Sequence, residues 1–250
     1  MSIYRDPQKI TEYLTEWIKD HFKAAGTKGA VLGISGGLDS AVLAGLLSRS
    51  LGKENVIGVI MPCHSQPLDE EYALELATAF GIRKYKVDLT KTYDQMVSSI
   101  KKEGLDLGTL SSANIKPRLR MTTLYSIAQE KGYLVCGGGN RDEIMYGYFT
   151  KHGDSGVDLL PMSDLLKGEV RTIALYLKVP PNIIERPPTA GLWAGQTDEA
   201  EMGLTYNELD NYLATGEAEN KVKEKIDKAI ARSDHKRKFA PMASIPKDIK

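Results

Sequence analysis

The residues with the clearest chemical meaning form the segment GISGGLDS at positions 33–40. An apolar run at 30–34 leads into this segment and a second one at 41–47 follows it, which predicts a strand, a glycine turn and a helix. Gly36 and Gly37 let the backbone turn tightly and approach an anion, because neither carries a Cβ. The N–H groups of the turn and of the helix start would face that anion, and the helix dipole favours it.

Polar side chains in the same segment add to this site. Ser35 and Ser40 are hydroxyl donors, and Asp39 places a carboxylate beside the expected phosphate position, which suits a Mg²⁺ ligand. The segment lacks the Gly-Lys-Ser or Gly-Lys-Thr of a Walker A loop. A simpler interpretation is a helix that is capped by Asp39 or Ser40 after a tight turn.

The string SGGxDS is more specific than a glycine pair, and it resembles the pyrophosphate-binding loop of the ATP pyrophosphatases. In that superfamily the loop holds the β and γ phosphates while ATP is split into AMP and pyrophosphate. The resemblance implies ATP contacts from the whole loop, namely Gly33, Ile34, Ser35, Gly36, Gly37, Leu38, Asp39 and Ser40.

Strands and helices alternate along the chain around this loop. Strands are expected at 30–34, 55–61, 84–88 and 133–137, and helices at 7–25, 39–50, 69–80, 90–102, 114–131, 140–148, 165–177, 205–214 and 217–232. This order predicts an α/β fold of three layers, in which a doubly wound, mostly parallel sheet carries helices on both faces. The ATP pyrophosphatase resemblance implies the same fold.

Ligands of such sheets bind beyond the carboxyl ends of the strands, where the strand order reverses. The glycine turn at 33–40 and the run GGGN at 137–140 are therefore expected to line one cleft. The stretch at 179–198 is rich in Pro and Gly and is expected to be a long loop. Loops of this length often act as lids over a site.

Length and composition exclude several classes of protein. The 250 residues fit one large domain over 1–250, and Lys plus Arg equal Asp plus Glu at 33 each, which argues against a nucleic-acid partner. Cys63 and Cys136 form no CxxC and are expected to be structural thiols in a reducing compartment. No apolar run approaches the ~20 residues of a membrane span, and the N-terminus does not suit a signal peptide. A cytoplasmic protein without a membrane partner is expected.

Further strings, in their order along the chain, resemble those of the ammonia-dependent NAD synthetases. They are NIKPRLRM at 114–121, GGGNRDE at 137–143, YFTKHGDSGVDLLP at 148–161, LLKGEV at 165–170, RPPTAGLWAGQTDE at 186–199, LTYNELD at 204–210 and SDHKRK at 233–238. The likeness covers about residues 4–238. It implies that ATP adenylates the nicotinate carboxylate of deamido-NAD with release of pyrophosphate, and that ammonia then displaces AMP to give NAD.

The resemblance also implies roles for single residues. Asp39 and Glu143 would bind Mg²⁺, Lys167 and Thr189 would contact ATP, and Asp39 and Lys167 would be catalytic. Taken singly, Glu143 and Lys167 also fit solvated helix residues and Thr189 a loop hydroxyl. One position departs from the family, in which a Gly-Thr pair ends the fourth strand. Gly138 stands in place of that threonine and can offer ATP only its backbone.

Deamido-NAD contacts follow from the same resemblance. They fall on Arg118, Lys151, Asp158, His235 and Lys236. If 114–131 is a helix, Arg120 points away from Arg118, so Arg120 is expected at the helix surface or at an interface. The resemblance further implies a homodimer with the dinucleotide site built across its interface.

The nitrogen source is expected to be free ammonia. The chain begins only about 30 residues before the ATP loop, which leaves no room for the N-terminal amidase domain of glutamine-using relatives. Two other functions remain as alternatives. A tRNA-modifying adenylating enzyme would need a basic surface and often CxxC pairs, and an ATP-binding sensor would have no use for five dinucleotide contacts.

Overall fold

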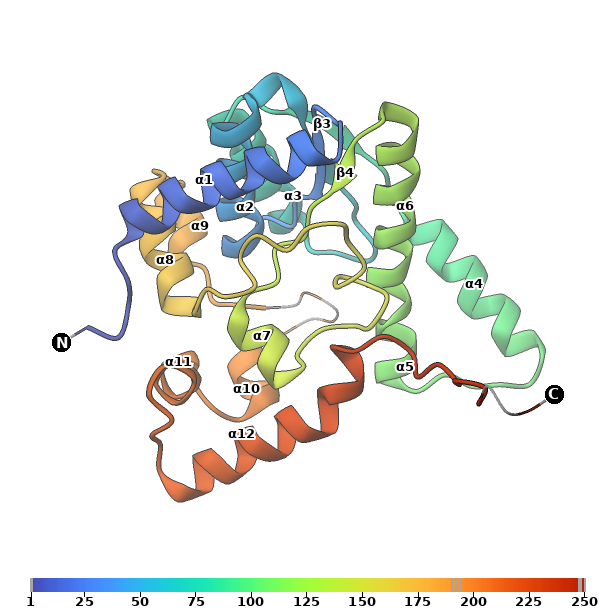
Figure 1. Ribbon diagram of the computed structural model, residues 1–250. Helices are drawn as coiled ribbons and strands as arrows, with labels where there is room; N and C mark the ends of the chain where they lie inside the picture. The colour runs from blue at the N-terminus through green and yellow to red at the C-terminus, as the bar shows by residue number, and fades with distance from the viewer. Residues whose placement is uncertain (1, 190, 192, 194, 247–248, 250) are drawn as a thin grey trace.

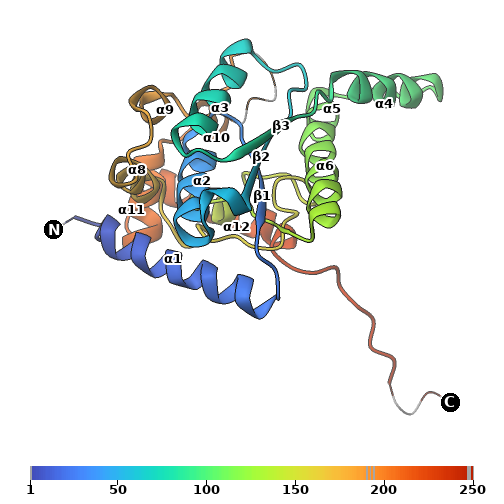
Figure 2. The same cartoon turned by 90° about the horizontal axis from the view of Figure 1, so that it is seen from above.

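A parallel sheet forms the centre of the computed structural model, which describes residues 2–189, 191, 193, 195–246 and 249. Its strand order, β3-β2-β1-β4, places β4 on the opposite side of β1 from β2 and β3. Figure 1 shows the whole molecule, and Figure 2 shows β3, β2 and β1 in this order. All three pairings are parallel, so the strand order reverses between β1 and β4. The predicted doubly wound α/β fold is confirmed. The strands are β1 (Ala30–Gly33), β2 (Val56–Ile60), β3 (Arg83–Lys86) and β4 (Leu134–Val135).

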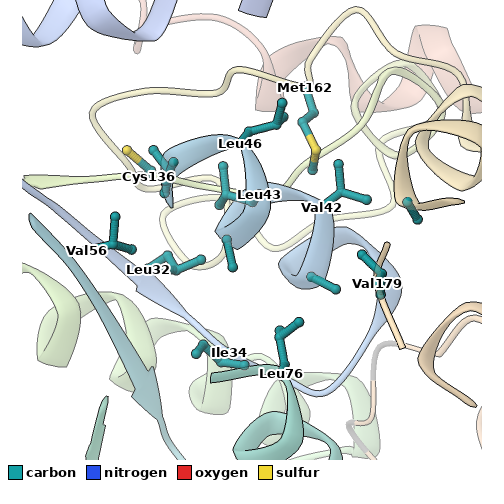
Figure 3. Packing of buried hydrophobic residues seen from close by; sticks show 14 of the residues in the cluster. Leu32, Ile34, Val42, Leu43, Leu46, Val56, Leu76, Cys136, Met162 and Val179 are labelled. Carbon is teal, nitrogen blue, oxygen red and sulfur yellow. The ribbon is translucent and has the colours of Figure 1, made fainter. Parts of the chain in front are cut away.

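Helices cover both faces of this sheet because strand side chains alternate between two apolar clusters. Leu32 and Ile34 belong to the cluster that contains Leu43 and Leu46, whereas Val31 belongs to the other. Figure 3 shows the first cluster, in which strand side chains meet those of α2. The first face carries α1 (Pro7–Ala24), α2 (Leu38–Leu51), α3 (Pro67–Ala79) and α8 (Lys167–Tyr176), and the second carries α6 (Ile115–Lys131).

A third apolar cluster lies in the C-terminal part of the chain. Leu209 and Ile226 are fully buried there, and Tyr146 and Tyr148 pack against them from the α7 side. This cluster packs the C-terminal helices together, and they lie below the sheet in the view of Figure 1. Its elements are α7 (Arg141–Tyr146), α10 (Asp198–Met202), α11 (Tyr206–Thr215) and α12 (Asn220–Ser233), with the short turn η2 (Asp234–Lys236) after them.

Other helices lie at the edges of the molecule. Helix α4 (Thr90–Lys102) has no buried residue and projects from the body, next to α5 (Thr109–Ala113) (Figure 2). A 3₁₀ turn, η1 (Lys53–Asn55), precedes β2. None of the described helices is long and apolar enough to cross a membrane.

The segment 179–198 differs from its expected form as one long loop. Helix α9 (Pro181–Glu185) occupies part of it, and α10 begins at its last residue. Pro181 starts α9 because a proline at the first helical position needs no hydrogen-bond donor and has a helical φ. The expected fourth strand, 133–137, is also shorter in the structure, where Cys136 continues it only as a bridge to Leu159.

The N-terminal segment is tied to the start of α8 by an ion pair. The Arg5 guanidinium donates to both carboxylate oxygens of Glu169, at 2.7 Å each, and also to Asp164 at 3.0 Å. Glu169 is only 1% exposed, and its carboxylate also accepts the Leu166 N–H. Burial by itself would raise the pKa of Glu169, but these hydrogen bonds outweigh burial and lower its pKa.

We predict that Arg5→Ala lowers the free energy of unfolding at pH 7 by about 2 kcal/mol, because it leaves a buried carboxylate underpaired. The native pKa of Glu169 lies below its ordinary value of 4.5, so this stabilisation is complete above pH 4.5 and disappears as pH falls through the native pKa. Urea unfolding of wild type, Arg5→Ala and Arg5→Lys at pH 7 and near pH 3 measures the effect. An equal loss at both pH values would contradict the assignment.

Candidate functional site

A cleft of about 750 Å³ opens beyond the carboxyl ends of β1 and β4. The glycine turn after β1 and the glycines at 137–139 after β4 both line it, as the sequence led us to expect. The start of α8 and the segment 186–189 form further walls. The cleft therefore lies where the strand order reverses, the usual ligand position in sheets of this type.

The glycine turn is shaped as an anion site. Gly37 is the N-cap of α2 and offers no capping side chain, so the first amides of the helix are left for a ligand. Ser40 Oγ donates to the Gly37 carbonyl at 2.9 Å, and Ser35 Oγ accepts the Gly37 N–H at 3.2 Å. Gly36 has φ = +75° and does not line the cleft. The loop residues that do line it are Gly33, Ile34, Ser35, Gly37, Leu38, Asp39 and Ser40.

Three charged side chains meet beside this turn. Lys167 Nζ lies 2.5 Å from Asp39 Oδ2 and 3.7 Å from Glu143 Oε1. Asn140 Nδ2 donates to the other Asp39 oxygen at 2.8 Å, and the Asn140 N–H donates to Glu143 at 3.2 Å. Asn140 thus orients both carboxylates toward the lysine. The structure brings together the three residues to which the sequence assigned the metal and the phosphates.

The charges in this group determine each other's protonation. The Lys167 side chain is only 6% exposed, and burial alone would lower its pKa. The Asp39 and Glu143 carboxylates outweigh burial and raise the pKa of Lys167 above the ordinary lysine value. Burial, followed by the charge of Asp39, raises the pKa of Glu143. Lys167 therefore stays protonated across the physiological range, so it acts as a fixed positive charge.

Two buried carboxyl groups hold the backbone of Lys167. Its N–H donates to Asp142 Oδ2 at 2.8 Å and to Asp210 Oδ1 at 3.0 Å, and the Gly168 N–H donates to Asp210 Oδ2 at 2.9 Å. Burial and the adjacent Asp210 raise the pKa of Asp142 to about 8. Tyr4 OH also donates to Asp210 at 2.8 Å. Helix α11 and the N-terminal segment thus position the start of α8.

The donor set around Asp39 and Glu143 fits a hard cation. The two carboxylates come from the neighbouring turns at the cleft floor, and both line the cleft. Among the described residues, no group of three or more His, Cys, Asp or Glu side chains is arranged to hold a metal ion. Two protein ligands suit Mg²⁺, which usually keeps several waters and completes its shell with substrate phosphates.

Asp198 is a buried carboxylate of the cleft that the sequence reading did not single out. Its Oδ2 accepts from Tyr206 OH at 3.0 Å, and its Oδ1 is buried with no hydrogen-bond partner among the described residues. Burial raises the pKa of Asp198, although Lys167 opposes the shift. The ring of Tyr206 also lies 4.9 Å from Lys167 Nζ. The segment 179–198 was expected to be a loop, so the sequence did not indicate that Asp198 would be buried at the start of a helix.

Four of the five residues expected to contact deamido-NAD are joined by hydrogen bonds or by sequence, and of these four only Lys236 lines the cleft. Arg118 donates to the Lys151 carbonyl at 3.3 Å, and Lys151 Nζ donates to the His235 carbonyl at 2.6 Å. Lys236 Nζ bonds the carbonyls of Gly147 and Phe149 at 2.7 Å each and lines the cleft.

The fifth residue, Asp158, has different partners. Its carboxylate accepts from Tyr125 OH at 3.0 Å and from the Val135 N–H at 2.8 Å. It therefore joins α6 to β4, and it does not line the cleft. Thr189 does line the cleft, and its hydroxyl accepts the Gly191 N–H at 3.1 Å.

The expectation for Arg120 is wrong. This side chain lines the cleft, and its Nε donates to the Met61 carbonyl at 3.2 Å. Arg118 is exposed and does not line the cleft. The helical spacing correctly separates the two arginines, but it cannot say which of the two directions faces the cleft. That choice depends on how α6 packs against the sheet.

Comparisons with known proteins agree with this geometry. The family model described as NAD synthase matches residues 10–240. An NH(3)-dependent NAD(+) synthetase of Finegoldia magna is 52% identical over 93% of this chain and 94% of its own length. Among solved structures, an NMN synthetase from Francisella tularensis has a TM-score of 0.91 at 37% identity, covering 96% of this chain and all of its own. An NH3-dependent NAD synthetase from Campylobacter jejuni has a TM-score of 0.81 at 28% identity, with coverages of 96% and 100%.

Gly138 yields a prediction about the missing threonine. It is not among the residues with positive φ, and an added Cβ would lie 3.5 Å or more from Asp39, which is ordinary contact. We therefore expect Gly138→Thr to fold and to bind ATP as well as wild type or up to about five-fold more tightly, the ~1 kcal/mol of one neutral hydrogen bond.

Gly137→Ala is the matched control for this substitution, because its Cβ would lie 2.9 Å from Leu160 and Val157 side-chain atoms. We expect a lower melting temperature for this control. Titration calorimetry with ATP and thermal unfolding measure both variants. A large loss of ATP affinity in a folded Gly138→Thr protein would show that glycine is required at this position.

Proposed function

Because the chain belongs to the NAD synthase family, we propose that it uses ATP to amidate deamido-NAD with free ammonia, forming NAD, AMP and pyrophosphate. The observation that carries this proposal is the contact of Lys167 with Asp39 and Glu143 directly beside the glycine turn. That arrangement supports the proposal, because a protonated lysine and two carboxylates suited to hold a metal ion lie beside the start of α2, where we propose that the triphosphate binds. A sensor that only binds ATP would have no use for the second-substrate contacts that the resemblance assigns to Arg118, Lys151, Asp158, His235 and Lys236.

The first half of the proposed reaction is adenylation. A nicotinate carboxylate oxygen attacks the α-phosphorus of ATP, and the bond from that phosphorus to the bridging oxygen breaks to release pyrophosphate. Negative charge builds up on the leaving group, so donors that already point at it lower the barrier. The amides at the start of α2 and the Lys167 ammonium are placed for this task.

Mg²⁺, when bound, would neutralise part of the phosphate charge. Asp39 and Glu143 are the residues that would hold it, and Asn140 keeps their carboxylates oriented. Lys167 lies between the same carboxylates, so it compensates their charge before a metal enters.

The second half of the proposed reaction is aminolysis. The nitrogen of ammonia attacks the acyl carbon, the bond from that carbon to the AMP oxygen breaks, and one proton leaves the nitrogen. Because only NH₃ carries the attacking lone pair, the rate at a fixed total ammonia concentration should rise with pH below the pKa of ammonium.

The proposed place for deamido-NAD is beside the linked residues Arg118, Lys151, His235 and Lys236, of which Lys236 lines the cleft. Asp158 joins α6, the helix that carries Arg118, to β4. We further propose a homodimer in which a second copy completes this site. Exposed apolar side chains on and beside the projecting helix α4 support this, namely Met96, Leu105 and Leu110. A cytoplasmic location, where ATP is available, belongs to the same proposal.

A second candidate function is amidation of nicotinate mononucleotide to NMN. The high structural similarity to the Francisella tularensis NMN synthetase favours it. The chemistry at the carboxylate is the same for both substrates, and only the AMP half of the dinucleotide distinguishes them. The relatives at 46–52% identity over at least 93% of the chain are NAD synthetases, which favours the dinucleotide.

Pyrophosphate release tests both functions in one assay. We expect sustained release over many turnovers only when ATP, a nicotinate nucleotide and ammonia are all present, with at least ten-fold higher kcat/KM for deamido-NAD than for nicotinate mononucleotide. Without ammonia, release should stop at about one pyrophosphate per active site, because adenylation precedes the attack of ammonia. Glutamine in place of ammonia should give no product. The reverse substrate preference would favour the second candidate, and equal rates with glutamine in ammonia-free protein would contradict the nitrogen source. Pyrophosphate release that requires neither nucleotide nor ammonia would contradict amidation altogether.

Asp39→Asn tests the assignment of the metal ligands. The substitution preserves shape but removes one ligand charge, so we expect kcat to fall by about 10² or more, as for other lost electrostatic contacts. The Mg²⁺ dependence of ATP binding, measured by calorimetry without the second substrate, should flatten in the same variant. Asp20→Asn, on an exposed position of α1, is the control and should match wild type. Unchanged activity and Mg²⁺ dependence in Asp39→Asn would remove the assignment.

A further inference from the structure

Arg186 makes a set of contacts that the proposed chemistry does not use. Its Nη2 donates to Asp69 in the first turn of α3, a residue 117 positions away in the sequence. Its Nη1 donates to the Gly36 carbonyl at 3.4 Å, and its guanidinium lies 5.5 Å from the centre of the Tyr72 ring. The Arg186 and Asp69 side chains are only 15% and 20% exposed, so the pair is shielded from solvent.

The Asp69 end of this pair is rigid. Its second carboxylate oxygen accepts the Gln66 N–H at 3.1 Å, and its own N–H donates to the Gln66 carbonyl at 3.0 Å. These are the two halves of a turn that starts α3, and the positive end of the helix dipole favours a carboxylate there. Arg186 is therefore attached to a fixed point of the fold.

Gly36 is the point where the glycine turn at 33–40, the proposed phosphate loop, contacts that same helix. An added Cβ at Gly36 would lie 2.6 Å from the Asp69 carbonyl and 3.0 Å from Tyr72 Cβ. The back of the loop is thus pressed against the first turns of α3, while its neighbours Ser35 and Gly37 line the cleft. The Gly36 carbonyl accepts from Arg186, and Gly36 itself does not line the cleft.

The same arginine begins the segment that closes one side of the cleft. Pro187 and Pro188 follow it, and their fixed φ angles transmit the position of Arg186 to Thr189. The Asp198 N–H donates to the Pro188 carbonyl at 3.2 Å. This bond attaches the first residue of α10 to the segment that follows Arg186.

We propose that Arg186 is a positioning residue that fixes the phosphate loop and the segment 187–189 in one arrangement, and thereby sets the affinity for the triphosphate part of ATP. This inference rests on the proposed function in so far as the ligand is ATP. It requires the planar guanidinium, because one side chain must reach a carboxylate and a carbonyl in different directions. A lysine keeps the charge but not this geometry.

The contacts of Asp69 allow a test that separates positioning from direct binding of phosphate. If Arg186 acts through its position, Asp69→Asn should weaken ATP binding as Arg186→Lys does, although the arginine is still present. If Arg186 instead contacts phosphate directly, releasing it from Asp69 should leave ATP affinity unchanged or increase it. Glu75→Gln is the matched control, since Glu75 accepts from Asn182 at 2.7 Å and joins the same two helices away from the loop.

The experiment is calorimetric titration of wild type and the three variants with Mg²⁺-ATP and with AMP, without a second substrate. We expect Arg186→Lys and Asp69→Asn each to weaken ATP about ten-fold and AMP less than two-fold, with Glu75→Gln like wild type. Thermal unfolding reports whether each variant is folded.

Three results would overturn the inference: unchanged ATP affinity in Asp69→Asn, equal losses for ATP and AMP, or an effect of Glu75→Gln as large as that of Asp69→Asn. Wild-type protein that binds ATP but fails in the amidation assay would count against the proposed function and leave this inference standing. Wild-type protein that does not bind ATP would overturn both.

Discussion

The ammonium group of Lys167 can lie at the floor of the cleft only because carboxylates surround it. Moving an isolated charge out of water costs several kcal/mol, so a lysine with 6% exposure requires nearby negative charge. Asp39 and Glu143 supply that charge, and each comes from a different glycine turn. These two turns must therefore meet at one point. They can do so because β1 and β4 are neighbours where the strand order reverses.

The same constraint extends to distant parts of the chain. The backbone of Lys167 is held by Asp142 from α7 and by Asp210 from α11, and Tyr4 bonds Asp210 from the N-terminal segment. The C-terminal helices and the first residues therefore have a purpose beyond filling the core. They fix the start of α8 against movement, so that the lysine side chain enters the cleft in one direction.

Sequence patterns identified the elements that carry strong periodicity and the residues in specific strings. The glycine turn, the helix after it and the strand before it were found where they were expected, because a buried strand and a buried helix require continuous apolar runs. The helix at 90–102 was also predicted with its observed bounds, although none of its residues is buried. By contrast, the composition of 179–198 did not predict α9. Pro180 and Pro181 fit a loop as well as the start of a helix, so they did not indicate which of the two forms there.

The sequence by itself determined the fold class and the glycine turn after β1, and its specific strings singled out Asp39, Glu143 and Lys167. It could do so because apolar periodicity and short local motifs depend on neighbours in the chain. Only the tertiary structure decided that Arg120 rather than Arg118 faces the cleft, that Asp198 is a buried carboxylate of the site, and that Arg186 reaches Asp69. Each of these depends on contacts between residues far apart in sequence, and such contacts follow from how helices pack on the sheet, which no local pattern records.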